Sequence, residues 1–143
     1  MDPLSVSMSS PDSSTDHPHV RHYKRMIEAF NGNDLGVVAE LLHPDVIYTV
    51  PGQSVLASVT RGIAAHLEML RLARERSGNT LKLEPRALVT SGEHLFVYGR
   101  ISAMRGERAL DSDHMVIFRF IGGRIVEGRT VPIDLYAFDA FWA

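Results

Sequence analysis

Four strand-like segments, joined by short glycine-containing turns, fill the second half of this 143-residue chain. Apolar and other side chains alternate within them, most clearly from Leu95 to Ser102. The segments are residues 81–89, 95–104, 109–120 and 124–131, and the turns contain Gly92, Gly106 and the pair Gly122 and Gly123. Because turns this short join antiparallel neighbours, this half of the chain predicts a meander of long antiparallel strands.

The first half of the chain has helical periodicity instead. Apolar residues recur three or four positions apart at Tyr23, Met26, Ile27 and Phe30, at Leu35, Val38, Leu41 and Leu42, and at Ile63, Leu67, Leu70 and Ala73. These stripes predict three helices. The second should end at His43-Pro44-Asp45 and the third should be capped by Thr60 and end at residues 77–79. A strand at residues 46–50 is expected between them, and the aromatic segment 135–143 predicts a short C-terminal helix.

Helices followed by a meander indicate an α+β fold. A strongly bent sheet that wraps around the helices would leave a cavity between the two layers. Pockets of this kind are mostly apolar and carry a few placed polar groups. The pattern therefore directs attention to the inner face of the sheet.

Charge and composition exclude several classes of function. Lys plus Arg number 15 and Asp plus Glu 17, a net charge of −2, which offers no surface for a nucleic-acid backbone or an anionic membrane. The absence of cysteine excludes disulfides, thiolate metal sites and a cysteine nucleophile. No apolar run is long enough to span a membrane, and no secretory signal opens the chain, so a cytoplasmic location is expected.

Residues 1–19 are rich in Ser, Asp and Pro and predict a disordered tail, followed by a single domain over residues 20–143. His17 and His19 lie at the end of this tail, and His22 follows shortly after it. A mobile segment supplies no fixed geometry for a metal ion, so no metal site is expected there.

Several short segments, in this order and spacing, resemble one family. They are Asn-Gly-Asn-Asp-Leu at residues 31–35, Leu-His-Pro-Asp-Val at 42–46, the segment 118–127 and the aromatic ending 134–142. Over residues 20–143 the chain resembles the nuclear transport factor 2-like superfamily, and within it the SnoaL-like polyketide cyclases and ketosteroid-isomerase relatives. The resemblance implies a cone of three N-terminal helices packed on a strongly curved, mostly antiparallel sheet that encloses one pocket. It also implies a homodimer through the outer face of the sheet, and no cofactor or metal.

The catalytic residues of these relatives are missing at the corresponding positions. Ketosteroid isomerases oppose a carboxylate base to an oxyanion hole of a tyrosine and a protonated aspartate. The resemblance places these three roles at Val50, Met26 and Val116. The His and Asp of SnoaL-type cyclases fall on Val116 and Thr130. The cavity is thus expected to persist without the inherited acid–base groups.

Strand parity predicts which side chains face the cavity. The inward positions are Val46, Tyr48 and Val50, then Val97, Gly99 and Ile101, then Ser112, His114, Val116 and Phe118, and finally Val126, Gly128 and Thr130. Tyr48 and His114, with Tyr23 from the first helix, are the catalytic candidates. The predicted substrate-binding residues are Met26, Phe30, Val50, Val97, Gly99, Val116, Phe118, Gly128, Thr130 and Trp142. Gly99 and Gly128 are expected to widen the cavity.

The remaining polar residues are interpreted as structural. His66 lies beside the apolar stripe of the third helix and is expected to be exposed to solvent rather than to approach the pocket mouth. Arg71, Arg74 and Arg76 are expected to form a solvated helix face. Asp113 should lie on the opposite face of its strand from His114, so the two should form no dyad. Glu127 and Arg129 are expected on the outer face, where they either pair across strands with Arg119 or lie at a dimer surface. The aromatic ending should dock on the sheet or cover the pocket.

The resemblance and the expected apolar cavity together imply a cyclase of secondary metabolism, such as antibiotic biosynthesis, that acts on a largely apolar, polyketide-type small molecule. With few acid–base groups, it would work chiefly by shaping the substrate, through a pericyclic [4+2] or dehydrative ring closure. Three alternatives remain open: a non-catalytic module that binds a hydrophobic metabolite, an isomerase or dehydratase that uses His114, and an interaction protein that uses the outer face of the sheet. An epoxide hydrolase is disfavoured because no inward Asp-Arg-Asp set is present.

Overall fold

The structure, a computed structural model, describes residues 17–143, and residues 1–16 of the predicted tail at residues 1–19 lie outside the described part. The helices are α2 (Pro18–Asn31), α3 (Leu35–Glu40), α4 (Ile63–Arg76) and α5 (Leu135–Trp142). The strands are β1 (Leu42–Val50), β2 (Ser58–Arg61), β3 (Lys82–Ser91), β4 (His94–Arg105), β5 (Arg108–Ile121) and β6 (Arg124–Pro132). All six strands form one sheet in the order β2-β1-β6-β5-β4-β3.

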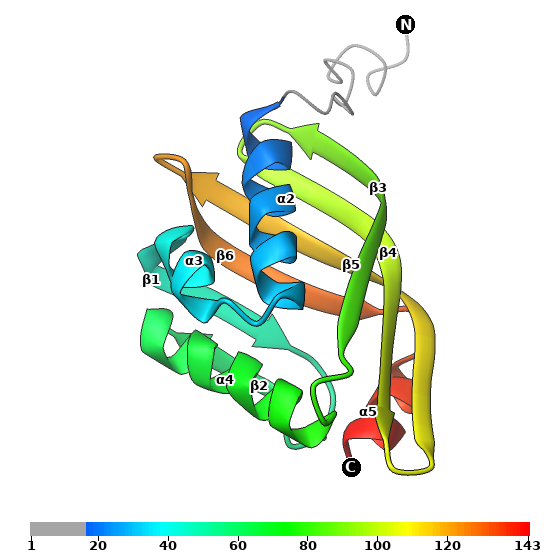
Figure 1. Cartoon of the computed structure of the whole chain (residues 1–143). Helices are drawn as coiled ribbons and strands as arrows, with labels where there is room; N and C mark the ends of the chain where they lie inside the picture. The colour runs from blue at the N-terminus through cyan, green and yellow to red at the C-terminus, as the bar shows by residue number, and fades with distance from the viewer. Residues whose placement is uncertain (1–16) are drawn as a thin grey trace, which may run out of the picture.

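The predicted meander is confirmed. Strands β3, β4, β5 and β6 pair with their sequence neighbours in antiparallel registers. Strand β1 adds to β6 in a parallel register, with Tyr48 opposite Gly128, and β2 pairs antiparallel with the other edge of β1. The long strands bend strongly, and the sheet stays open at β2 and β3 (Figure 1).

The helices cover the concave side of the sheet (Figure 1). Helix α2 contacts β3 and β4, α4 contacts β1 and β2, and α5 contacts β5 and β6. The most deeply buried side chains come from every layer and include Val20, Tyr23, Leu95, Val97, Ile125 and Trp142. The core therefore lies between the helices and the concave face, where the sequence predicted a cavity.

Three boundaries differ from those predicted. Helix α2 begins at Pro18, with the His17 side chain accepting a hydrogen bond from the His19 amide, so residues 18 and 19, which the sequence placed in the tail, are helical. Residues 43–45 lie within β1 rather than ending a helix. Thr60 caps no helix: it lies in β2, a strand that short length and mixed polarity concealed, and its hydroxyl donates to the Tyr48 carbonyl. The third helix instead follows Gly62, whose φ of 87° suits glycine.

One register shift changes which residues of β6 face inward. A β-bulge between the pairs Arg119–Glu127 and Phe120–Ile125 leaves Val126 as the extra residue. Ile125 is consequently fully buried, and Val126, predicted to face inward, is only half-buried. Parity is regained beyond the bulge, where Gly128 and Thr130 face the interior as predicted.

Candidate functional site

The predicted cavity is present as two adjoining compartments between the helices and the sheet. The first, of about 60 Å³, lies between α2, α4 and the sheet, and the second, of about 80 Å³, extends toward α5. Both are lined by Phe30, Tyr48, Leu70, Leu83 and Val116. Each is smaller than the roughly 150 Å³ engineered cavity that holds benzene. A larger ligand would therefore need these shared side chains to shift.

Tyr48 is the polar centre of the site. Its hydroxyl lies 2.5 Å from Thr130 Oγ1, in a hydrogen bond that either group could donate. Gly128 makes this contact possible, because a Cβ there would lie 2.4 Å from the Tyr48 ring. The prediction that Gly128 widens the cavity is therefore wrong, because the Tyr48 ring occupies the space that a side chain at Gly128 would fill. Burial raises the pKa of Tyr48 to about 12, so its hydroxyl stays protonated at neutral pH.

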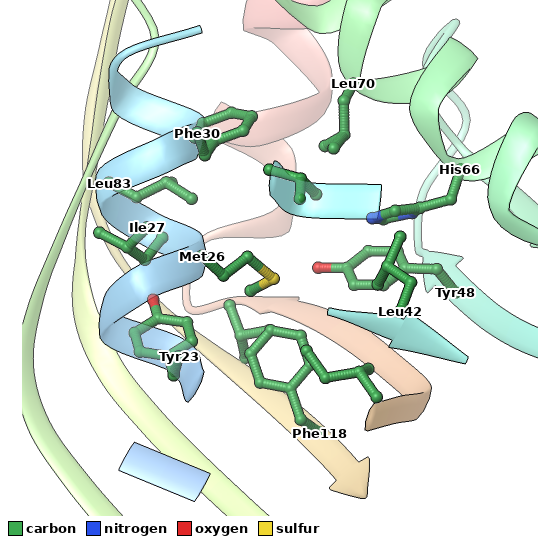
Figure 2. Close-up of a pocket in the computed structure, with 13 residues that line it drawn as sticks. Tyr23, Met26, Ile27, Phe30, Leu42, Tyr48, His66, Leu70, Leu83 and Phe118 are labelled. Atoms are coloured by element: carbon green, nitrogen blue, oxygen red, sulfur yellow. The ribbon is translucent and has the colours of Figure 1, made fainter. Parts of the chain in front are cut away.

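His66 belongs to the site, and its predicted exposure is wrong. The residue is 5% exposed, lines the first compartment, and lies with its ring centroid 4.7 Å from that of Tyr48 (Figure 2). Its Nδ1 is buried without a hydrogen-bond partner. Desolvation lowers the pKa of His66 to about 4, so the imidazole is neutral at pH 7.

His114 and Trp142 line the second compartment. His114 is 3% exposed, and burial lowers its pKa, a shift that a hydrogen bond with the Gly99 backbone partly opposes. His114 Nδ1 and the indole Nε1 of Trp142 are both buried without a hydrogen-bond partner. The C-terminal helix thus covers the end of the cavity, with Phe138 and Trp142 facing inward and Tyr136 in solvent.

Tyr23 lies in the first compartment, on the α2 side opposite Tyr48 (Figure 2). The side chain is 1% exposed and its hydroxyl has no hydrogen-bond partner. Burial raises the pKa of Tyr23 well above its usual range, which keeps the phenol protonated. Like Tyr48, it can donate a hydrogen bond but cannot act as a base near neutral pH.

Most predicted binding residues line the cavity. Met26 and Phe118 line the first compartment, Val50, Thr130 and Trp142 the second, and Phe30 and Val116 both. Val97, Gly99 and Gly128 line neither compartment. Val97 is packed in the core, and a Cβ at Gly99 would lie 2.4 Å from the Glu84 carbonyl oxygen, so this glycine admits the neighbouring strand instead of widening the cavity.

The acidic residues of the meander lie on the other face, as parity predicts. Asp113 accepts a hydrogen bond from the Tyr98 hydroxyl at 2.8 Å and lies near Arg86, away from His114. Arg100 pairs with Asp111. The predicted pair of Arg119 and Glu127 is confirmed, with 2.8 Å between nitrogen and oxygen. No carboxylate therefore lines either compartment.

One arginine of α4 is buried, contrary to the prediction of a solvated face. Arg71 is exposed and pairs with Glu68, and Arg76 is exposed. Arg74 is only 5% exposed, and its guanidinium lies 4.8 Å from the centre of the Phe30 ring. The prediction failed because periodicity does not show how far neighbouring side chains cover a helix flank.

The chemistry available here is hydrogen bonding and proton transfer by neutral groups. Across residues 17–143, no group of three or more His, Cys, Asp or Glu side chains is close enough to hold a metal ion. In the same part of the chain, no helix has both the length and the apolar character needed to cross a membrane. The site consists of apolar walls, two phenols, two neutral imidazoles, one indole and one threonine hydroxyl.

The family model of the SnoaL-like domain matches residues 23–128, which include most residues of the two compartments. The chain belongs to the SnoaL-like domain family. An uncharacterised protein of Mycobacterium tuberculosis is 31% identical over 131 residues, covering 90% of this chain and 99% of that protein. Membership supports a small-molecule-binding or catalytic protein and assigns no substrate.

Solved structures show the same architecture. Bal32a, from a soil-derived mobile gene cassette, has a TM-score of 0.85 at 28% identity, over 88% of this chain and 97% of that one. A nuclear transport factor 2-like protein of unknown function from Burkholderia pseudomallei has a TM-score of 0.81 at 22% identity, over 89% and 98%. A protein from Sinorhizobium meliloti that is named a putative polyketide cyclase has a TM-score of 0.67 at 18% identity, over 77% of this chain and 93% of that one. The last two likenesses concern the fold alone, and they confirm the nuclear transport factor 2-like cone.

Proposed function

We propose that this SnoaL-like protein is a cyclase that closes a ring in a largely apolar, polyketide-type intermediate. One observation carries the proposal: an apolar interior contains buried polar atoms without partners, namely Tyr23 Oη, His66 Nδ1, His114 Nδ1 and Trp142 Nε1. Each such atom costs about 1–3 kcal/mol in a folded protein. Their concentration around one cavity is explained if a ligand with oxygen functions supplies the missing hydrogen bonds.

The Tyr48–Thr130 pair would polarise a substrate carbonyl. Two hydroxyl groups share one hydrogen bond, so one of the two hydroxyl hydrogens remains for a ligand whichever group donates. Because the raised pKa of Tyr48 keeps the phenol protonated, this hydrogen is available across the physiological pH range. A donor of this kind stabilises the negative charge that develops on oxygen during enolisation or aldol-type closure.

The two neutral imidazoles would receive or return the proton. His66 lies beside Tyr48, and His114 lines the neighbouring compartment, so a substrate polarised at Tyr48 lies between possible proton acceptors. Their lowered pKa values make them weak bases, which leaves substrate shaping as the larger contribution. Confinement and orientation alone can contribute roughly 7–11 kcal/mol to lowering a barrier.

The test uses linear polyketones of increasing length, with ring formation followed by absorbance and mass spectrometry. Tyr48→Phe removes the hydroxyl from the cavity and is expected to lower the rate by about 10²-fold. Tyr98→Phe is the matched control, because its hydroxyl binds Asp113 on the outer face. Equal rates for the wild type and the Tyr48 variant on every substrate cyclised would contradict the role of Tyr48.

A non-catalytic binding module is the second candidate. The observation in its favour is that Met26, Val50 and Val116, where the resemblance places the relatives' catalytic groups, present only apolar side chains to the cavity. Native mass spectrometry would then detect a retained apolar metabolite whose mass does not change on prolonged incubation. The homodimer, the cytoplasmic location and a role in antibiotic biosynthesis stay predictions.

A further inference from the structure

Arg74 lies on the same face of α4 as the side chains that line the cavity. His66, Leu70 and Arg74 follow one another at intervals of four residues, so they lie one above the other on the same side of the helix. The first two line the first compartment. Arg74 lies beyond them against Phe30, whose ring lines both compartments and lies with Leu70 at one end of the cavity (Figure 2).

The guanidinium is a buried charge without a counter-ion. Among residues 17–143, Arg74 is the one Lys, Arg, Asp or Glu residue in the buried class. Its Nε and one terminal nitrogen are buried without a hydrogen-bond partner, and no carboxylate of the described residues forms an ion pair with it. Burial lowers its pKa, and no neighbouring acid opposes that effect. Arginine nevertheless keeps its charge in proteins, so the cost of burying it is not relieved by deprotonation.

Phe30 compensates for this cost only in part. The face of an aromatic ring attracts a cation, and the distance of 4.8 Å between the guanidinium carbon and the ring centre is within the range of that interaction. A ring face, however, accepts no conventional hydrogen bond from the planar fork of N–H donors. The donors on Nε and the terminal nitrogen match the two oxygens of a carboxylate, the partner for which this fork is best suited.

We infer that the ligand of this cavity is a carboxylic acid with an apolar body, whose carboxylate pairs with Arg74 at the Phe30 end while the body occupies the two compartments. The inference rests on the proposed function and adds a substrate class to it. A single buried cation indicates a monoanion, since a phosphate dianion would leave one charge uncompensated in an apolar surrounding. The site would thereby distinguish an acid from its ester or alcohol.

The experiment compares octanoate with 1-octanol, which share an apolar chain and differ in the head group. Trp142 is the only tryptophan of the sequence and lines the second compartment, so its fluorescence reports occupancy directly. At pH 7 we expect the wild type to bind the anion at least as tightly as the alcohol. Arg74→Met should weaken octanoate by roughly tenfold or more and leave octanol within about twofold.

Two further variants distinguish loss of the Arg74–carboxylate pair from a general change in charge or folding. Arg71→Met removes an exposed charge one turn earlier on the same helix and should leave both affinities unchanged. Arg74→Lys keeps the positive charge and should retain part of the octanoate affinity, which also guards against a folding defect in the methionine variant. If Arg74→Met leaves octanoate binding intact, or weakens both probes equally, the carboxylate inference is overturned. If the wild type binds neither probe, the small-molecule cavity of the proposed function fails with it.

Discussion

His66 should make the protein lose stability in mild acid. The imidazole is 5% exposed, so folding transfers it from water into an apolar surrounding that disfavours its charged form. Its pKa falls from the ordinary 6.5 in the unfolded chain to about 4 in the folded one. Between these two values the unfolded chain binds the proton and the folded chain does not. Acid therefore favours unfolding, and the stabilisation present above pH 6.5 is lost as the pH falls toward 4.

The size of the effect follows from the two pKa values. At pH 5 the imidazole is almost fully protonated in the unfolded chain and about one-tenth protonated in the folded chain, which corresponds to about 2 kcal/mol of lost stability. The limiting loss, well below pH 4, is about 3 kcal/mol. His114 is buried and has a lowered pKa as well, so it adds to the loss in the same direction.

Urea unfolding at pH 7 and pH 5 measures the effect in the wild type and in His66→Gln, which fills a similar volume and does not titrate. The difference between the two pH values should be smaller in the variant by about 2 kcal/mol. His43→Gln is the control, because that imidazole is 30% exposed and lies at the surface. If the wild type and His66→Gln lose the same free energy of unfolding between pH 7 and pH 5, His66 is not held neutral by burial and the argument is refuted.

Three further substitutions test the packing around Tyr48 and one helix. Gly128→Ala would place a Cβ 2.4 Å from the Tyr48 ring and should push the ring away from Thr130. Urea unfolding should then show a free energy of unfolding lower by about 1–3 kcal/mol, and an unchanged midpoint would contradict the close fit. Thr130→Val removes the hydroxyl partner of a buried phenol and should cost about 1–3 kcal/mol in the same assay, whereas a neutral effect would mean that Tyr48 finds another partner. Gly36→Ala, at an exposed position within α3, should raise the unfolding free energy by about 0.5–1 kcal/mol, and a loss would indicate that this short helix does not form in solution.

The site that results has no carboxylate among the residues that line its two compartments. Its phenols stay protonated and its imidazoles stay neutral because the same apolar interior raises the pKa of the first and lowers that of the second. Such groups donate and accept hydrogen bonds without carrying charge. The uncharged groups around Tyr48 suit a reaction in which the walls orient a flexible chain and a few donors select its carbonyl oxygens, while the one buried cation of the described residues, Arg74, lies at the Phe30 end.

Local patterns in the sequence were sufficient for the meander and for the inward placement of Tyr48, His114, Val116 and Phe118. Side chains alternate across a strand, so the direction of one inward residue determines that of its neighbours until a bulge intervenes. Short glycine turns similarly determine that successive strands pair antiparallel. Tyr23, Met26 and Phe30 could be predicted to line the cavity because they belong to one apolar stripe of a helix, and that stripe packs toward the sheet.

The burial of His66 and Arg74 was decided by the tertiary structure. Both lie on α4 beside the apolar stripe, and the spacing of His66, three residues after Ile63 and four before Leu70, was the one signal that placed it near the core. Periodicity shows on which side of its own helix a side chain lies. It does not show how far another helix or strand covers that side chain. The α2 side chain Phe30, distant in sequence, covers Arg74.

The tertiary structure likewise decided the fit of Tyr48 over Gly128 and the inward turn of Ile125. The first depends on the parallel register of β1 with β6, which joins segments about 80 residues apart, and the second on a bulge opposite Phe120. The sequence alone determined the type and order of most elements and an apolar interior, because those depend on neighbouring residues. Cavity shape, protonation states and the unpaired cation depend on side chains brought together by long-range pairing, and only the folded chain determines them.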